Sequence, residues 1–355
     1  MKNKFKNLQK STKNSFINYG IILAVYVIVQ IFIATGSLSS MLQGLLVPLC
    51  TYVIAAVSLN LVVGFSGELS LGHAGFMCVG AYASAFFSNC VGDAMPGILR
   101  FIIAMLIGAA VAGIFGILIG IPVLRLRGDY LAIVTLAFGE IIKNLMNVFY
   151  IGIDGSGLHI QASDSGAMVL DEGGRMIVNG ALGITGTPKD STFTIGVIMV
   201  LVTLFIVQNL VNSRSGRAVM AIRDNRIAAE SVGINITKYK LMAFSISAAL
   251  AGVAGVLYSH NLATLTVKKF DYNTSIMILV YVVLGGIGNI RGSIIAAVIL
   301  TALPELLRGL SDYRMLIYAI VLVVMMLFNW APAAITWRER MKEKFAKKPK
   351  TKEAA

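Results

Sequence analysis

The sequence predicts an all-α integral membrane protein, a polytopic bundle of about ten transmembrane helices. Hydrophobic residues make up 57% of the 355 residues and charged residues only 13%, and the mean hydropathy is +0.81. Such values lie outside the range of soluble globular domains. Because a spanning helix needs about 20 apolar residues, the chain has room for roughly eight to eleven spans. We expect them near residues 17–35, 43–65, 70–88, 98–121, 129–150, 193–211, 241–261, 274–290, 293–309 and 314–334.

The first apolar run follows a basic amino-terminal segment, residues 1–15, which holds five lysines. The tripeptide 34–36, Ala-Thr-Gly, loosely resembles a signal-peptidase site. However, an apolar core of about 18 residues is longer than the 7–15 residues usual in a cleaved signal. We therefore expect an uncleaved first span with the amino end in the cytoplasm. We expect residues 16–335 to form the membrane domain and 336–355 to form a basic cytoplasmic tail.

The charges in the loops set the expected orientation. The outer loop, residues 151–192, carries five acidic and two basic residues. An even number of spans with both termini inside agrees with the positive-inside rule, with Lys268 and Lys269 as exceptions. Three arginines and two basic segments fall inside: Arg125, Arg127, Arg291, 213–240 and 336–355.

Several function classes are excluded by composition. The formal charge of +13 is concentrated at the termini and in the 213–240 segment, and no soluble basic domain is present, so we expect no nucleic-acid partner. Cys50, Cys78 and Cys90 show neither a disulfide framework nor metal-ligand spacing. Clustered His, Cys or carboxylate residues with catalytic spacing are missing, which argues against a membrane enzyme. We predict no cofactor and no metal. The outer loop is too small for an independent core.

Small residues recur every four positions in two spans. This spacing lets helix backbones approach closely in lipid, although Gly and Ala are also simply common in membrane helices. Both interpretations predict a tightly packed bundle. The residues are Ala112, Gly116 and Gly120 in one span and Ser247, Ala251 and Gly255 in the other.

Glycines interrupt the apolar sequence at residues 60–76. Broken backbone at membrane depth is tolerated only where it is buried in protein or lines a wet cavity. A half-helix starting there would direct N–H groups at an anion such as an amino-acid carboxylate, which makes Ser70, Gly72 and His73 translocation-path candidates. Charge counting favours the alternative, a tight cytoplasmic turn in which Glu68 and His73 make local contacts.

A second break, residues 284–293, contains two more path candidates, Gly285 and Gly286. Its glycines superficially resemble a phosphate-binding loop, but the preceding soluble strand and the following Lys-Ser/Thr are missing. The chain contains no Gly-Lys dipeptide, which excludes a Walker A motif. If ATP drives this protein, another polypeptide hydrolyses it.

Two charged residues lie within an apolar run. Glu140 and Lys143 are three residues apart, so they share one helix face and can neutralise each other. Ionisable residues within a span are functional candidates by default, and Glu140 is therefore a translocation-path candidate. The alternative is that Lys143 lies near the outer interface and extends its ammonium to water.

The segment 213–233 is a compact charged island between two spans. Arg223, Arg226 and Glu230 recur at i, i+3 and i+7, which predicts one stripe on a short helix that ends at Gly233. Apolar residues border the stripe on both sides, Met220 and Ile227 on one and Ile222 and Ala229 on the other. The pattern favours a helix that docks on a partner over a merely solvated loop.

Several motifs then resemble one family. Within the island, 228–233 (Ala-Ala-Glu-Ser-Val-Gly) looks like the cytoplasmic coupling loop of ABC-importer permeases. Ser-Leu-Gly-His-Ala-Gly-Phe at 70–76, Arg-Leu-Arg-Gly-Asp-Tyr-Leu-Ala-Ile-Val-Thr-Leu at 125–136 with 138–142, and the run 281–291 resemble branched-chain amino acid permeases of the LivM type. The motifs occur in the same order and cover most of 45–330.

The resemblance implies an ABC-importer permease architecture of roughly ten helices in a bacterial cytoplasmic membrane. A second, related permease, two cytoplasmic ATP-binding subunits and an extracytoplasmic substrate-binding protein are the implied partners, and leucine, isoleucine and valine are the implied cargo. Carried over by position, the 213–240 segment is the coupling loop. Its implied coupling residues are Arg223, Asp224, Arg226, Ala229, Glu230 and Gly233.

One departure from the family and two alternatives remain. The stretch 164–179 looks like an expansion of a segment that is usually shorter in the family. It puts the docking of the binding protein, and with it the cargo, in question. Related permeases import urea, amides or nucleosides. An ion-coupled secondary transporter would instead act alone, and would be expected to carry more paired charges within its spans.

Overall fold

The computed structural model describes residues 10–126, 128–155, 157–162, 174–310 and 313–330. Each of the ten predicted spans overlaps one apolar helix in these ranges. The chain divides into two compact units, 1–301 and 302–355, and α13 belongs to the second. The helices are α2 (Lys10–Ala34), α3 (Ser40–Asn60), α4 (His73–Val91), α5 (Gly97–Val123), α6 (Asp129–Val148), α7 (Phe193–Asn212), α10 (Ile236–Ser259), α11 (Tyr272–Gly285), α12 (Ile290–Leu306) and α13 (Arg314–Trp330).

The helices have the lengths and composition of membrane spans. Among the described residues, seven are long and apolar enough to cross a bilayer, and three shorter apolar segments lie in α2, α11 and α13. The predicted polytopic helical fold is thereby confirmed. A π-helix, η1 (Leu61–Ser66), continues α3 toward α4.

Helix α10 lies at the centre of the first unit and packs on α3, α4 and α5. Small residues form these crossings, because helices in lipid gain their association from close backbone packing. A Cβ atom on Gly116 would lie 2.6 Å from Ala248 Cβ, and one on Gly252 would lie 2.5 Å from Ala112 Cβ. The small-residue spacing in α5 and α10 therefore marks a real packing surface.

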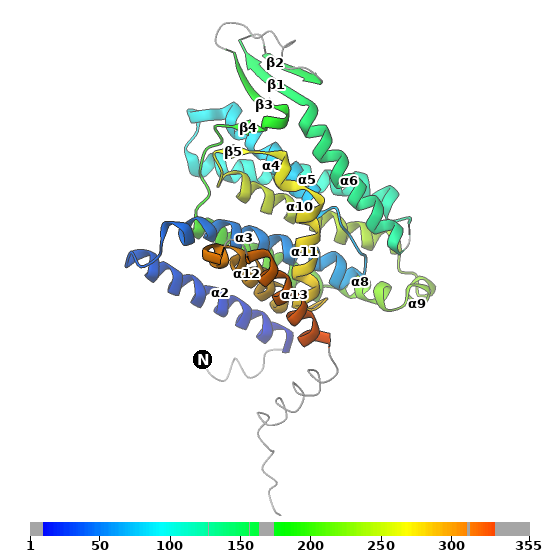
Figure 1. The fold of residues 1–355 in the computed structure, drawn as a ribbon. Helices are drawn as coiled ribbons and strands as arrows, with labels where there is room; N and C mark the ends of the chain where they lie inside the picture. Colours follow the sequence, from blue (N-terminus) through cyan, green and yellow to red (C-terminus); the bar gives the residue numbers. More distant parts are fainter. Residues whose placement is uncertain (1–9, 127, 156, 163–173, 311–312, 331–355) are drawn as a thin grey trace, which may run out of the picture. The chain divides into compact units, whose positions relative to one another are not determined.

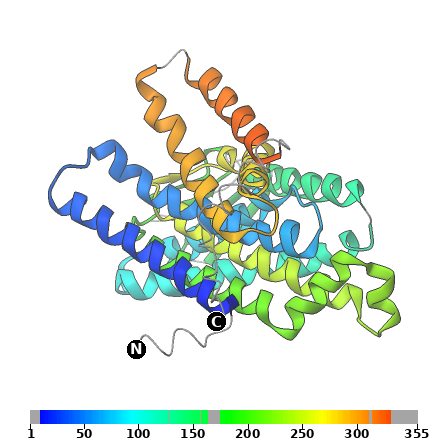
Figure 2. The ribbon, with the colours of Figure 1, turned by 90° about the horizontal axis from the view of Figure 1, so that it is seen from below.

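Polar side chains fix where several helices begin. Ser39 accepts a hydrogen bond from the Leu42 N–H at the start of α3, and Thr192 accepts one from Ile195 at the start of α7. Such caps satisfy N–H groups that have no partner within the helix. In Figure 2, α2 and α3 run antiparallel and are joined by a short turn. Tyr26 of α2 contacts α7 through the Phe193 ring and the Thr194 hydroxyl.

The outer loop is not a simple loop. It forms most of a five-stranded antiparallel sheet with the order β2-β1-β3-β4-β5. Sequence analysis did not predict this sheet, because its strands are short and the last one comes from the connection between α10 and α11. The predicted expansion 164–179 lies mostly outside the described residues, and its end forms β3. The strands are β1 (Phe149–Asp154), β2 (Gly157–Ala162), β3 (Arg175–Asn179), β4 (Ile184–Thr185) and β5 (Thr264–Leu265).

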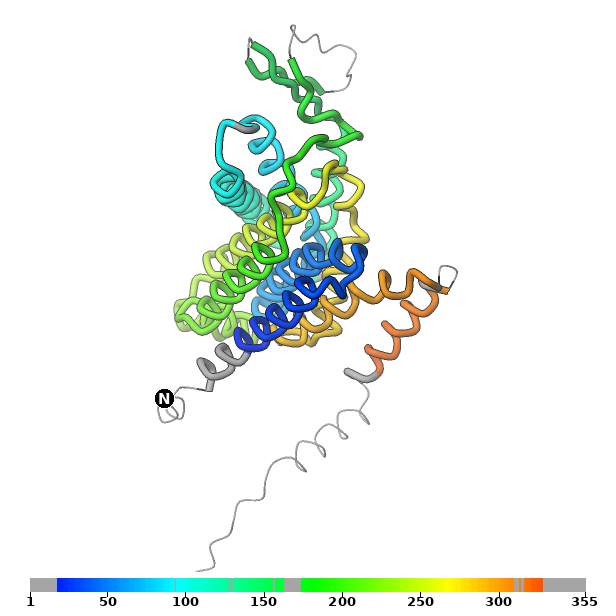
Figure 3. Tube along the Cα trace, turned by 90° about the vertical axis from the view of Figure 1, so that its left-hand side faces the viewer, coloured from blue at the N-terminus to red at the C-terminus, as the bar shows by residue number. Residues whose placement is uncertain are grey.

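The sheet and the charged island lie at opposite ends of the spans. β1 continues directly from the end of α6, whereas the island helices α8 (Arg214–Asp224) and α9 (Arg226–Ser231) lie beside the start of α6 (Figure 1). Figure 3 shows the same separation from a second direction.

Candidate functional site

The charged island folds as two helices instead of one. Ser213 caps α8 by accepting from the Gly216 N–H at 3.0 Å. Asn225 has an extended backbone (φ −153°, ψ 104°), which ends α8, and its side chain accepts from the Ala228 N–H at 3.0 Å to begin α9. The predicted single stripe of Arg223, Arg226 and Glu230 is therefore wrong, because the first residue lies on α8 and the other two on α9.

The inner face of the island is an apolar anchor. Ile222, Ala229 and Ile236 form a buried cluster with Ile234 and Tyr239 packed against it. Ala229, one of the predicted coupling residues, thus holds α9 to the start of α10 and does not present a side chain to a partner. The anchor fixes the angle between α8, α9 and the following span.

The outer face of the island combines apolar and charged side chains. Ile227 is 81% exposed and Val232 is 74% exposed. Asp224, Glu230 and Gly233 are exposed around them, and Arg226 is half-buried. Two large exposed apolar side chains, one near the start of α9 and one just after its end, rimmed by charges, have the composition of a protein-interaction surface. The charged members of this surface were predicted from the sequence, whereas Ile227 was expected only to border the charged stripe.

Arg223 points back toward the bundle. Its Nη1 donates to the carbonyl oxygen of Gly64 in η1 at 2.9 Å, while Nε and Nη2 donate to Asp224 Oδ1 at 3.0 and 2.8 Å. The guanidinium group therefore joins the island to the first helix break.

The first break passes from η1 through an extended segment into α4. Gly67 follows η1 in the left-handed region (φ +72°), which glycine adopts without steric cost. Glu68 forms an ion pair with Lys240 of α10, and both side chains are largely buried. Leu71 donates its N–H to Thr135 Oγ1 of α6 at 3.0 Å. The segment is held by residues far away in the sequence.

His73, the first residue of α4, is only 2% exposed. Its Nε2 lies 2.6 Å from Ser58 Oγ of α3, and the next N–H, that of Ala74, donates to Ser275 Oγ of α11 at 3.0 Å. The predicted turn with only local contacts at Glu68 and His73 is therefore wrong. The chain that follows the break is therefore enclosed by protein, and its backbone N–H groups are bound by side chains of α6 and α11.

Two other path candidates of the first break are also enclosed by this chain. Ser70 is buried, and its hydroxyl has no hydrogen-bond partner among the described residues. Gly72 lies so close to Thr135 that a Cβ atom would overlap the Thr135 carbonyl oxygen. Ser70, Gly72 and His73 thus lie together inside the bundle.

The second break is a tight turn between α11 and α12. Gly286 adopts φ +94° in this turn. A Cβ atom on Gly285 would lie 2.5 Å from Ser293 Cα, so the helices approach closely there. Asn60 connects the two breaks: its Oδ1 accepts from the Gly288 N–H at 2.9 Å, and its Nδ2 donates to Ser293 Oγ at 3.1 Å. Asn60 was not among the residues predicted from the sequence. An Asn at the end of an apolar run could have indicated a role in structure or function, because polar groups are costly in a membrane.

Glu140 and Lys143 form the predicted i, i+3 ion pair, with 2.5 Å between Oε2 and Nζ. Glu140 Oε1 also accepts from the Tyr272 N–H at 3.1 Å, at the start of α11. Burial alone would raise the pKa of the neighbouring Asp271, but hydrogen bonds from Thr274 and Asn273 and the Lys143 ammonium lower it below its ordinary value. A charged cluster therefore joins α6 to the start of α11.

Comparisons with known proteins show the family of the chain. Residues 41–328 match the family model "Branched-chain amino acid transport system / permease component". The chain belongs to this permease family. It is 36% identical over 299 residues to the high-affinity branched-chain amino acid transport system permease protein LivM of Salmonella typhimurium, covering 80% of this chain and 67% of that protein.

Two further relatives show the range of similarity. LivM of Escherichia coli is 36% identical over 293 residues, again 80% of this chain and 67% of that protein. The fructose import permease protein FruG of Bifidobacterium longum is 24% identical over 296 residues, 80% of each chain. No solved structure gives a significant match. The relatives are permease subunits of ABC transporters, so this permease is a multi-pass inner-membrane protein and not an enzyme.

The family membership assigns ATP hydrolysis to partner subunits. Permeases of this kind act with ATPase and substrate-binding components. Within the described residues, no group of three or more His, Cys, Asp or Glu residues could hold a metal ion. Cys50 and Cys78 are buried free thiols and Cys90 is exposed.

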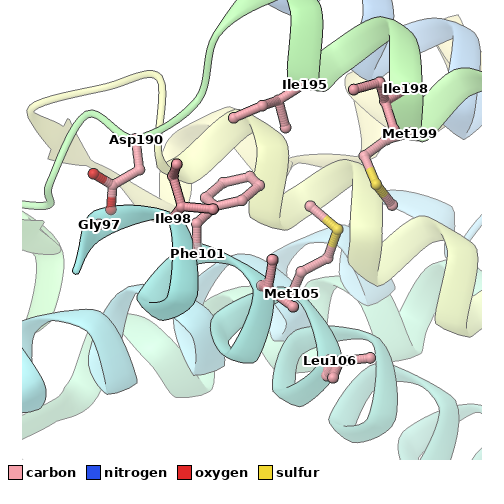
Figure 4. Close-up of a pocket in the computed structure, with 10 residues that line it drawn as sticks. Gly97, Ile98, Phe101, Met105, Leu106, Asp190, Ile195, Ile198 and Met199 are labelled. Carbon is pink, nitrogen blue, oxygen red and sulfur yellow. The ribbon is translucent and has the colours of Figure 1, made fainter. Parts of the chain in front are cut away.

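A groove of about 530 Å³ lies between α5 and α7 of the permease. Figure 4 shows side chains such as Phe101, Met105 and Met199 lining it. Among the described residues that line it, Asp190 is the one with a charge, and both of its carboxylate oxygens accept from Arg100.

Proposed function

We propose that this chain is the permease subunit of an ATP-driven ABC importer for branched-chain amino acids. It pairs with a second homologous permease and receives leucine, isoleucine or valine from an extracytoplasmic substrate-binding protein. Two cytoplasmic ATP-binding subunits drive it, and both of its termini lie in the cytoplasm. The similarity to LivM over 80% of the chain carries the choice of cargo, since the fructose permease is much less similar.

The proposed ATPase contact is the outer face of α8 and α9. Ile227 and Val232 offer apolar side chains to a groove, and Asp224, Arg226, Glu230 and Gly233 surround them. The buried anchor behind this face holds both helices firmly against the bundle. A rigidly anchored, amphipathic helix pair can transmit the displacement of a bound partner to the bundle, whereas a solvated loop cannot.

The proposed translocation path runs along the outer half of α6. Glu140 and Lys143 are partly exposed within an otherwise apolar span, and charged groups there face a wet path or another protein instead of acyl chains. The proposed second permease would supply the opposite wall. Ser70, Gly72, His73, Gly285 and Gly286 support this path from within the bundle, where they set the positions of α4, α11 and α12.

The test is uptake by the complete complex in proteoliposomes. We expect ATP-dependent accumulation of radiolabelled leucine that requires both ATP-binding subunits and the binding protein. Urea, amide, nucleoside or sugar uptake without leucine uptake would overturn the cargo. Leucine uptake by the isolated chain would overturn the ABC mechanism in favour of an ion-coupled transporter.

The ATPase contact is tested by charge changes on its outer face. Glu230→Lys and Ile227→Asp are expected to reduce co-purification of the ATP-binding subunits while membrane insertion stays intact. Arg217→Gln, at an exposed position on α8 outside this face, is the matched control. Equal co-purification for all three variants would exclude docking through this face. Labelling of Glu230→Cys only from the exterior would exclude the proposed orientation.

A further inference from the structure

Arg223 belongs to a continuous set of contacts that runs from the island to both helix breaks. Its methylene groups pack on Gly67, where an added Cβ atom would lie 2.6 Å from Arg223 Cγ. Its guanidinium donates to the Gly64 carbonyl oxygen at 2.9 Å. Arg223 is thus bound to the two ends of the short stretch 64–67.

Gly64 in turn is packed against the second break. A Cβ atom on Gly64 would overlap Asn60 Oδ1 and would lie 2.7 Å from Gly288 Cα. Asn60 binds Gly288 and Ser293 as described above, and the Asn60 and Ser293 side chains are fully buried. Because both the amide oxygen and the amide nitrogen of Asn60 are used, the two breaks are fixed together as one body.

The end of η1 explains why a side-chain donor can bind at this point. After η1 the chain turns away, and the N–H groups of Gly67 and Glu68 both return to the Val62 carbonyl oxygen. The Gly64 carbonyl oxygen then accepts from the side chain of Arg223. A forked guanidinium can bind this oxygen and Asp224 at the same time, which a single ammonium group does less well. The Lys240–Glu68 ion pair holds the next residues of the break.

We propose that Arg223 is a positioning residue for transport: it transmits displacement of α8 to the joined breaks, and through them to α4, α11 and α12. This inference rests on the proposed function, in which α8 and α9 receive the ATPase. It separates two roles that the sequence placed on one stripe. Ile227, Glu230 and Val232 make the ATPase contact, whereas Arg223 passes the motion inward.

The first experiment compares Arg223→Gln with Arg217→Gln in the reconstituted complex. Both arginines are on α8 and each binds a backbone carbonyl group, but Arg217 binds that of Asn212 beside its own helix. For Arg223→Gln we expect normal co-purification of the ATP-binding subunits and about a tenfold rise in ATP hydrolysed per leucine imported, a typical size for coupling between sites. Arg223→Lys should restore part of the loss, and Arg217→Gln should behave as the parent protein.

The second experiment uses spin labels and does not depend on the cargo, and its first arm uses the protein with Arg223 intact. Labels are placed at Arg214→Cys on α8 and Ile287→Cys in the second break, in a Cys90→Ser background, because the other two cysteines are buried. With Arg223 intact, the distance between the labels should stay constant when the ATP-binding subunits of the complex bind ATP. In Arg223→Gln it should change, because α8 then moves without the break.

Three results would overturn the proposal. One is loss of ATPase co-purification in Arg223→Gln, which makes Arg223 a docking residue. Another is an unchanged ratio of ATP to leucine. The third is a change in label distance on ATP binding when Arg223 is intact. Failure of the proposed function is distinguishable, because the ATP-binding subunits would then not co-purify even with the parent protein.

Discussion

Gly255 of α10 packs directly on Met77 of α4: a Cβ atom on the glycine would overlap the Met77 carbonyl oxygen and lie 2.8 Å from the carbonyl carbon. Backbone cannot move aside as a flexible side chain can. Gly255→Val should therefore separate the two helices and destabilise the permease by about 1–3 kcal/mol. The measurement is the thermal unfolding midpoint of the purified protein in detergent.

Gly44 in α3 provides the matched control for this substitution. No atom lies within 4 Å of a Cβ atom built there. Gly44→Ala should be neutral or stabilising by up to about 1 kcal/mol, because alanine is the better helix former. Equal midpoints for Gly255→Val and Gly44→Ala would show that the α4–α10 crossing tolerates expansion.

The Arg100–Asp190 ion pair holds the start of α5 to the segment before α7. The side chains are 8% and 18% exposed, and their closest N–O distance is 2.8 Å. Asp190→Leu alone should cost about 3–5 kcal/mol because it leaves a buried guanidinium without its carboxylate. The double variant Arg100→Met, Asp190→Leu should lose much less. Thermal midpoints of the single and double variants decide between these expectations.

The exposed pair Arg308–Glu305 is the comparison for that prediction. Its side chains are 67% and 31% exposed. Arg308→Gln should change stability by less than about 1 kcal/mol, as for other surface ion pairs. A loss from Arg308→Gln as large as that from Asp190→Leu would contradict the assignment of the Arg100 effect to burial.

The spans were predictable because hydrophobicity over about 20 residues is a local property of the chain. The i, i+3 pair of Glu140 and Lys143 was predictable for the same reason, since helical spacing alone brings the two side chains together. The small residues of α5 and α10 also gave the packing surfaces, although not their partners. Gly255, for example, meets a backbone carbonyl group of α4 that no spacing rule identifies.

The features that were not predicted correctly from the sequence depend on contacts between distant segments. Arg223 turns inward because a π-helix 159 residues earlier presents the Gly64 carbonyl oxygen. The break at Asn225 depends on one residue with extended backbone, which the i, i+3, i+7 pattern cannot register. The sheet needs Ile184 to pair with Leu265 from another connection. None of these three features can be predicted until the contacts of the folded chain are known.

The side chain of Gln208 in α7 places an amide group in the protein interior. Neither Oε1 nor Nε2 has a hydrogen-bond partner among the described residues, and the side chain is buried. An unsatisfied buried polar group costs about 1–3 kcal/mol, so Gln208→Leu should raise the thermal midpoint. Thr135→Val is the contrast, because the Thr135 hydroxyl accepts from Leu71 and donates to Ala132.

Thr135→Val should therefore lower the midpoint, since it leaves the partly buried Leu71 N–H without its acceptor. If Gln208→Leu instead lowered the midpoint as much as Thr135→Val, the prediction would be wrong. The amide of Gln208 would then have a bound water as its hydrogen-bond partner.

In the Glu140–Lys143 pair, each charge has its own position relative to the start of α11, and exchanging the two charges tests whether that placement matters. Glu140 accepts from the Tyr272 N–H, so its carboxylate faces the positive end of α11, and Lys143 faces the Asp271 carboxylate. The swap Glu140→Lys, Lys143→Glu keeps the ion pair but places a cation at the helix start and two carboxylates together. We expect it to cost about 1 kcal/mol, from a helix-dipole contribution of roughly 0.3–1 kcal/mol and added repulsion.

Glu140→Gln separates stability from transport at the same position. The amide oxygen can still accept from Tyr272, so the thermal midpoint should fall less than for the swap. Leucine uptake should nevertheless fall, because the charge that the proposed path presents to a zwitterionic substrate is gone. A swap as stable as the parent protein would show that α11 does not depend on a carboxylate at residue 140, and unchanged uptake by Glu140→Gln would remove this residue from the path.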